Sequence, residues 1–203
     1  MKRSTLISLK TLVWLACLWP LASLIGRAIT NNLGADPSAA ITFATGLAAL
    51  RLLTISLAIT PLRKLFPRLN WLIRFRRLLG LFAFFYATLH LFNYLALYAG
   101  FDVNTMAADL TKRRYIMAGF AAWLLLVPLA VTSTNWAIRK LGGKRWNRLH
   151  KLVYAAAVLG VIHYWWQVKP GVRTPLTITV ILAALLLTRP LLSYVQARKL
   201  RTT

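Results

Sequence analysis

Six long apolar runs, separated by short polar or basic segments, constrain the fold of this chain more than any other feature. They cover residues 6–26, 41–60, 78–98, 115–132, 149–166 and 176–195. A helix needs roughly 20 mostly apolar residues to cross the hydrocarbon layer of a bilayer, and each run approaches that length. The sequence therefore predicts an all-α integral membrane protein, a bundle of about six transmembrane helices, with residues 1–203 as a single domain.

The charge of the chain fits this prediction better than it fits a soluble protein. Only 14% of the residues are charged, yet the formal net charge is +23. In a soluble protein such an excess would indicate binding to nucleic acid, but here the basic residues lie in short loops between apolar runs. We expect membrane lipid and no nucleic acid as a partner. The first run follows Lys2 and Arg3 like a signal peptide, but it is long and lacks a clear cleavage site, so we expect it to remain a helix.

The distribution of Lys and Arg predicts the orientation in the membrane. Most of them lie before the first run, between the second and third, between the fourth and fifth, and after the sixth. The alternate loops hold few, together with all three aspartates, Asp36, Asp102 and Asp109. Because cytoplasmic loops are enriched in Lys and Arg, we expect both termini to be cytoplasmic in a bacterial inner membrane.

The chain has three histidines, all within predicted helices, where ionisable residues are costly and usually functional. His90 lies fourteen residues after Arg76, and His163 lies fourteen residues after Leu149. Both helices run outward, so both side chains lie roughly 20 Å from the cytoplasmic side. Two imidazoles at one depth are what a haem with two axial histidines requires. A hydrogen bond to a neighbouring helix is the alternative for each histidine, and copper or zinc is a weaker one.

His150 lies at the cytoplasmic end of the fifth predicted helix, about 20 Å from His163. It is a candidate ligand of a second haem. A separation of thirteen residues places the side chains of His150 and His163 at different angles on an ideal helix. If both bind haem, the helix must have a kink or a second site must lie on another face.

Arg51 falls near the middle of the second predicted span, where an unpaired charge costs at least ~2.5 kcal/mol. No acidic residue lies in any predicted span. We expect its partner to be a haem propionate, a flavin or quinone, or a lipid phosphate; the alternative is that the side chain extends to the interface.

Several motifs in order resemble one known family. They are TGLAALR (45–51), TPLR (60–63), RRLLG (76–80), YATLH (86–90), WNRLHKLVY (146–154) and HYWW (163–166). Together they resemble the haem-binding membrane subunits of bacterial protein-methionine-sulfoxide reductase systems, within the ferric-reductase-like transmembrane family.

This resemblance implies an electron-transfer subunit rather than the catalytic subunit of an oxidoreductase. It implies haem b bound by His90, His150 and His163, with FMN as a further cofactor. Electrons would come from the quinone pool or a cytoplasmic flavin reductase. They would pass to a periplasmic molybdopterin-containing methionine sulfoxide reductase that repairs oxidised proteins.

The sequence departs from larger members of the family at Arg76 and Arg77, which stand where those members have an additional histidine. We therefore expect one or two haems, and we place Arg77 with Arg51 among the cofactor-binding residues. Two other functions stay open: a transporter or proton relay that uses His90, His163 and Arg51, and an assembly subunit that binds haem without turnover.

Overall fold

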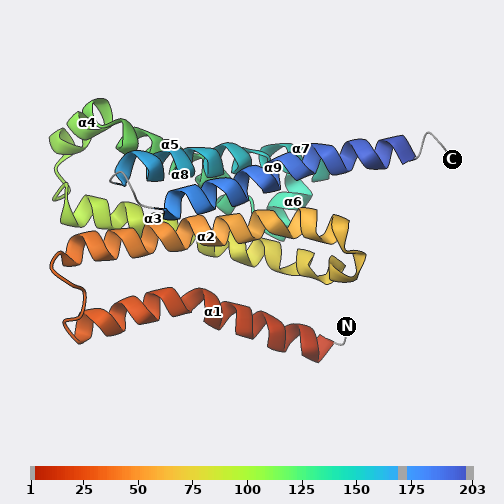
Figure 1. The fold of residues 1–203 in the computed structure, drawn as a ribbon, viewed down its shortest axis with the longest axis horizontal. Helices are drawn as coiled ribbons and strands as arrows, with labels where there is room; N and C mark the ends of the chain where they lie inside the picture. Colours follow the sequence, from red (N-terminus) through yellow and green to blue (C-terminus); the bar gives the residue numbers. More distant parts are fainter. Residues whose placement is uncertain (1–2, 169–172, 200–203) are drawn as a thin grey trace.

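Helices form all the regular structure of the part of the chain that the computed structural model describes, residues 3–168 and 173–199 (Figure 1). Their bounds are α1 (Arg3–Ile29), α2 (Pro37–Leu65), the 3₁₀ helix η1 (Pro67–Leu72), α3 (Ile73–Leu97), α4 (Val103–Lys112), α5 (Arg114–Val131), α6 (Asn135–Leu141), α7 (Gly143–Leu149), α8 (Leu152–Gln167) and α9 (Thr174–Lys199). This confirms the predicted all-α class.

Five of the described helical segments are long and apolar enough to cross a membrane: α1, α2, η1 with α3, α5 and α9. The remaining expected span, 149–166, coincides with α8, which has only 16 residues because the helix begins at Leu152. The sequence prediction of an integral membrane protein is thus confirmed. The fifth expected span forms a helix, α8, that is shorter than predicted.

Short polar side chains set where several helices begin. Asp36 accepts a hydrogen bond from the backbone N–H of Ala39 at 2.9 Å, and Pro37 occupies the first turn of α2, where its missing N–H costs nothing. Asp102 caps α4 in the same way through the N–H of Thr105. The hydrogen bonds from Thr105 lower the pKa of Asp102, so this cap is ionised near neutral pH.

Two helix pairs build the core: α2 packs on α3, and α5 packs on α8. Figure 1 shows them lengthwise beside one another, with α9 against α2 and α8. Leu50, Leu57, Ala156 and Ala157 are buried where the pairs meet. This arrangement brings the C-terminal half of α3 close to the C-terminal half of α8, where His90 and His163 meet, although the two helices are far apart in sequence.

Helix α1 lies at the edge of the bundle and is bent near Pro20 (Figure 1). Proline cannot donate the hydrogen bond that continues a helix. The hydroxyl of Tyr86 enters the helix at this point: it donates to the carbonyl of Cys17 at 2.7 Å and accepts from the N–H of Leu21 at 3.1 Å. A buried side chain of α3 thus ties α1 to the core.

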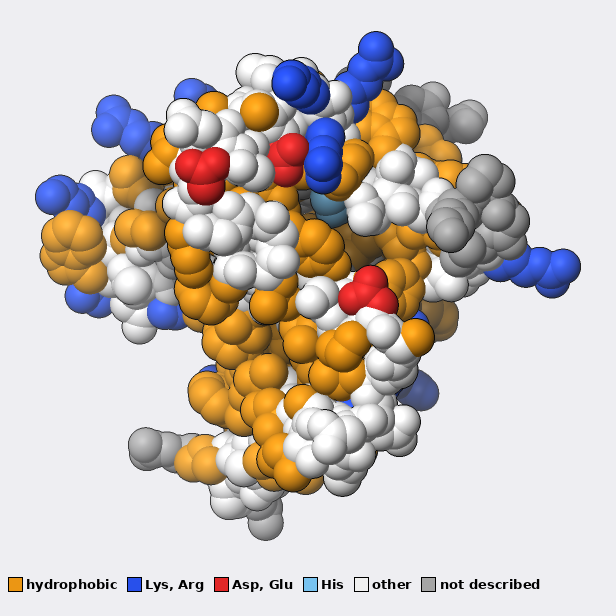
Figure 2. All heavy atoms as spheres, turned by 90° about the vertical axis from the view of Figure 1, so that its left-hand side faces the viewer, with side chains coloured by type: hydrophobic (Ala, Val, Ile, Leu, Met, Phe, Trp, Pro, Cys, Tyr) orange, Lys and Arg blue, Asp and Glu red, His pale blue; other side chains and the backbone are white. Residues whose placement is uncertain are grey.

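The two ends of the bundle differ in charge. The start of α1 and the end of α9 lie at one end, which we call the basic end because residues 63–77 and 139–151 also approach it (Figure 1). The opposite end, the aspartate end, carries α4 together with Asp36, Asp102 and Asp109. Figure 2 views the aspartate end, where a histidine side chain is visible in a hollow beneath a basic side chain and beside hydrophobic groups.

Candidate haem site

The imidazole rings of His90 and His163 lie side by side between α3 and α8. Their ring centroids are 5.7 Å apart, and their planes are nearly perpendicular at 82°. Both side chains are half-buried. The structure therefore brings together the two histidines that the sequence places at one depth.

Each ring donates a hydrogen bond to a backbone carbonyl of a neighbouring helix. Nδ1 of His90 lies 2.9 Å from the carbonyl oxygen of Thr42, and Nδ1 of His163 lies 2.7 Å from that of Tyr115. A carbonyl oxygen only accepts, so Nδ1 carries the proton in both rings. Each Nε2 then presents a lone pair, and no described residue forms a hydrogen bond with it.

Two glycines leave the space that the rings occupy. A Cβ atom added at Gly46 would lie 2.9 Å from Nδ1 of His90, and one added at Gly119 would lie 2.7 Å from Nδ1 of His163. Contacts this short do not occur between real side chains, so any larger residue would displace a ring. Sequence reasoning missed both positions, since a glycine within an apolar run has no distinguishing signal of its own.

These contacts repeat between the two helix pairs. Both carbonyl acceptors precede their histidine by 48 residues, and Gly46 and Gly119 precede His90 and His163 by equal intervals. The α2–α3 pair and the α5–α8 pair thus use the same arrangement of carbonyl, glycine and histidine.

The spacing of the rings fits a metal held between them. A bond from a metal to an imidazole nitrogen is about 2 Å long, so rings on opposite faces of one iron have centroids roughly 6 Å apart. The observed 5.7 Å is close to that value. No group of three or more His, Cys, Asp or Glu side chains that could hold an ion occurs among the residues described.

His150 lies away from this pair, in the turn that separates α7 from α8. Its Nε2 is 3.1 Å from the hydroxyl of Thr132, and its ring stacks on Trp146 at 3.8 Å. The break in the helix after Leu149 removes His150 from the helix that carries His163. Burial, with a smaller contribution from the charge of Arg76, lowers the pKa of His150, so its ring is neutral near pH 7.

The two arginines singled out in the sequence occupy different places. Arg51 is exposed on α2 and lines a cavity of about 460 Å³, which also contains Arg173 at the start of α9. Arg77 is exposed and donates a hydrogen bond to the side chain of Asn135 at 2.9 Å. Within the described residues the only ion pair joins Asp109 and Arg113, so neither arginine has a carboxylate partner there.

Comparison with known proteins decides the family. The model of the family described as "Ferric reductase like transmembrane component" matches residues 45–161, which include Gly46, His90 and Gly119 and end two residues before His163. The chain belongs to this ferric-reductase-like transmembrane family. The expectation from the sequence motifs is therefore confirmed at the level of the family.

Close relatives narrow the comparison within the ferric-reductase-like family. The chain is 49% identical over 183 residues to the protein-methionine-sulfoxide reductase heme-binding subunit MsrQ of Herminiimonas arsenicoxydans, covering 89% of this chain and 84% of the relative. It is 49% identical over 189 residues to MsrQ of Xanthomonas axonopodis pv. citri, covering 90% and 86%. For MsrQ of Rhodospirillum rubrum the identity is 50% over 179 residues, covering 87% and 85%. No solved structure matches the chain.

Proposed function

We propose that this protein is a transmembrane b-type cytochrome in which His90 and His163 are the axial ligands of one haem. The observation that carries the proposal is the pair of rings, 5.7 Å apart, in which neither Nε2 forms a hydrogen bond with a described residue. The names of the relatives, which describe heme-binding subunits, support it. A haem b bound there supplies one-electron chemistry at its iron.

The residues around the rings prepare the two ligands. The carbonyls of Thr42 and Tyr115 fix the tautomer of each imidazole and restrict its rotation. A hydrogen bond from Nδ1 also raises the electron density at Nε2, which makes the ring a stronger ligand. Gly46 and Gly119 let the rings pack directly against the backbones of α2 and α5.

We infer the direction of electron flow from the position of this pair. It lies toward the aspartate end, which we expect to be periplasmic because Lys and Arg gather at the other end. Electrons from the quinone pool or a cytoplasmic flavin reductase would enter at the basic end. They would leave to a periplasmic molybdenum-dependent methionine sulfoxide reductase. In this scheme the bacterial inner membrane is the location.

A second cofactor would lie near His150, at the basic end. His150 has a neutral ring, and Arg77 occupies a position on α3 comparable to that of His150 before α8. We propose that these two residues border an inner haem or an FMN. Arg77 can donate hydrogen bonds but cannot ligate iron, so it favours an anionic group of the cofactor next to α3.

Arg51 and Arg173 are the residues proposed to neutralise a cofactor anion near the outer haem. They line one cavity with the hydroxyls of Thr54, Thr174 and Thr177, and no described carboxylate balances them. A haem propionate has the charge and the oxygen acceptors that two guanidinium groups would bind.

The proposed electron transfer is tested by turnover in vesicles. Purified protein in proteoliposomes with reduced quinone inside should reduce methionine sulfoxide outside when the periplasmic reductase is present. The same vesicles with the His163→Ala variant are the control. A haem-containing protein without turnover would indicate the assembly subunit, and transport activity in haem-free protein would indicate the transporter.

A further inference from the structure

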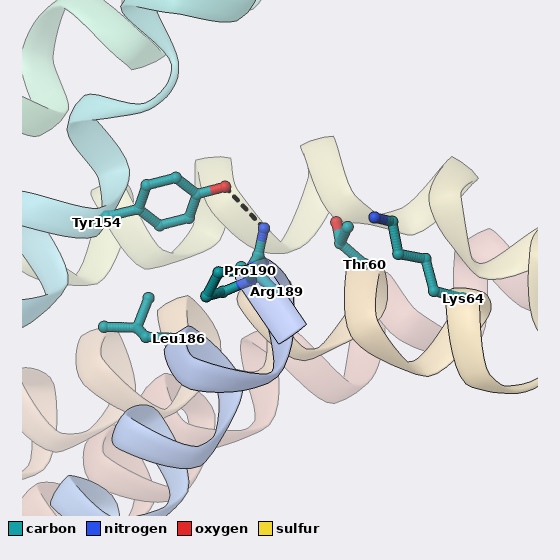
Figure 3. A pocket seen from close by; sticks show the side chains of 6 residues that line it. All are labelled: Thr60, Lys64, Tyr154, Leu186, Arg189 and Pro190. Atoms are coloured by element: carbon teal, nitrogen blue, oxygen red, sulfur yellow. Dashed lines mark hydrogen bonds between the residues drawn. The ribbon is translucent and has the colours of Figure 1, made fainter. Parts of the chain in front are cut away.

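A second cavity opens at the basic end between α2, α8 and α9, apart from the histidine pair. It has a volume of about 360 Å³ and is lined by Thr60, Lys64, Tyr154, Leu186, Arg189 and Pro190. In Figure 3, the side chains of Thr60 and Lys64 from α2 lie opposite Arg189 of α9 and Tyr154 of α8. Three helices thus direct hydroxyl groups and cationic groups to one place.

Positive charge at this cavity has no protein counter-ion among the described residues. Lys64 and Arg189 line it, and Arg76 lies close enough to interact electrostatically with Arg189. The one described ion pair, Asp109 with Arg113, belongs to the aspartate end. Uncompensated cations beside a membrane-spanning segment are costly unless an anion joins them.

Arg189 is held in place by a defect in α2. Pro61 has no N–H to donate to the carbonyl of Leu57, so this carbonyl is left without its helical partner. Nη2 of Arg189 donates to it at 2.6 Å, while Nη1 donates to the hydroxyl of Tyr154 at 2.7 Å. The guanidinium also lies over the Tyr154 ring, 4.9 Å from its centroid. The charge is therefore fixed before any ligand binds.

Two polar atoms at the cavity lack partners. Nε of Arg189 and the hydroxyl oxygen of Thr60 are both buried without a hydrogen bond to any described residue. An unsatisfied buried donor costs about 1–3 kcal/mol, so such atoms point to a ligand that accepts hydrogen bonds. Lys64 is exposed at the rim and adds an ammonium group.

We propose that this cavity binds a phosphate group. Phosphate oxygens accept several hydrogen bonds and carry the charge that the guanidinium, ammonium and hydroxyl groups require. The group could come from a flavin mononucleotide or from the headgroup of an anionic lipid, and both share this chemistry. The volume exceeds that of phosphate alone and leaves room for the atoms attached to it.

The site does not depend on the proposed haem, although a flavin there would rest on the proposed function. Tyr154 lies in the first turn of α8, four residues after His150 in the sequence, so a flavin anchored by its phosphate here would lie at the same end of the bundle as His150. A lipid phosphate would instead anchor α9 against α2 at the cytoplasmic side of the membrane.

The test uses full-length protein in detergent and compares Lys64→Gln and Thr60→Val with Arg63→Gln. Arg63→Gln removes the same charge one residue away, from a side chain that does not line the cavity. Arg189 is left intact because it also supports α2. Binding of FMN and of riboflavin, which lacks the phosphate, is measured by fluorescence quenching. Retention of phosphatidylglycerol and of phosphatidylcholine is measured by native mass spectrometry.

Lys64→Gln should lower the affinity for the phosphate compound about tenfold, as expected for one lost charge-assisted hydrogen bond. Arg63→Gln should leave this affinity unchanged. FMN binding that exceeds riboflavin binding and falls in both cavity variants identifies a flavin. Selective phosphatidylglycerol retention that falls in the same variants identifies a lipid. If neither ligand responds to Lys64→Gln or Thr60→Val, the proposal is wrong. Haem absorbance, recorded in each sample, shows separately whether the proposed function holds.

Discussion

At the scale of single residues, hydrogen bonds to two backbone carbonyls decide which nitrogen of each histidine is available. The carbonyls of Thr42 and Tyr115 accept hydrogen bonds from Nδ1 of His90 and His163, and each Nε2 forms no hydrogen bond with a described residue. Backbone carbonyls in a helix normally bond within the helix. Thr42 lies in the second turn of α2, and Tyr115 lies in the first turn of α5. The N-terminal ends of these two helices therefore provide the carbonyl groups that orient the rings.

Gly119 tests this arrangement directly. Gly119→Ala places a Cβ 2.7 Å from Nδ1 of His163, so the ring must move and its hydrogen bond to Tyr115 must lengthen. Overpacking of this kind costs about 1–3 kcal/mol, and we expect a clear loss of bound haem, measured as haem per protein after purification. Gly26→Ala is the matched control, because nothing lies within 4 Å of a Cβ at Gly26. Equal haem content in both variants would contradict the proposed packing.

Arg51 supports a second prediction at this scale. Removing a positive charge near the haem stabilises the ferric form, so Arg51→Gln should lower the haem midpoint potential by on the order of tens of millivolts. Arg173→Gln should act in the same direction, since it lines the same cavity. Potentiometric titration measures the shift. The control is Arg27→Gln, because Arg27 is exposed in the last turn of α1 and donates a hydrogen bond to the backbone carbonyl of Asn32. An unchanged potential in both cavity variants would mean that Arg51 serves another anion.

The sequence predicted the histidine pair but not its surroundings. Histidine is rare in this chain, so His90 and His163 could be singled out and compared by counting residues. Gly46, Gly119 and the two carbonyls could not, because their role depends on which neighbouring helix packs against them. Arg173 falls between the fifth and sixth expected spans, and the cavity that it shares with Arg51 depends on where α9 begins.

At the scale of helices, the bend in α1 gives a prediction about stability. Tyr86→Phe removes the hydroxyl that satisfies the Cys17 carbonyl and the Leu21 N–H beside Pro20. Leaving these buried groups without partners should lower the free energy of unfolding by about 1–3 kcal/mol, measured by denaturant unfolding in detergent. Tyr98→Phe is the control, because Tyr98 is exposed. Equal stability of the two variants would show that the bend forms without the hydroxyl.

The apolar runs predicted the long helices, and the polar connections were less predictable. Each expected span falls on an observed helix, but α4, α6 and α7 lie in segments expected to be loops. Their signals are local: Asp102 caps α4, and Thr134 caps α6. The break at His150 also could not be anticipated, since no proline or glycine lies next to it in the sequence.

At the scale of the whole molecule, the charge difference between the two ends predicts the topology. Green fluorescent protein fused after Thr203 should fluoresce, because it folds in the cytoplasm, and alkaline phosphatase at the same position should be inactive. Alkaline phosphatase inserted between α4 and α5, next to Lys112, should be active. The reverse pattern would place the histidine pair near the cytoplasm and contradict the proposed direction of electron transfer.

The arrangement of helices follows from the pairing of α2 with α3 and of α5 with α8, which the sequence does not reveal. The two pairs share the spacing of glycine and histidine, but few other positions match between them. The repeat of carbonyl, glycine and histidine is therefore visible in the packing of the helices but not in the composition or the motifs of the sequence. The consequence is a site formed by one histidine from each pair.

The central claim is that one haem lies between His90 and His163. The most direct measurement is a reduced-minus-oxidised absorption spectrum with pyridine haemochrome quantitation, on wild type and on the His90→Ala, His163→Ala and His150→Ala variants. We predict a low-spin b-type spectrum that is lost with His90→Ala or His163→Ala, whereas His150→Ala affects only an inner cofactor. A normal spectrum in either of the first two variants, or a wild type without haem after haem-sufficient expression, would contradict the account.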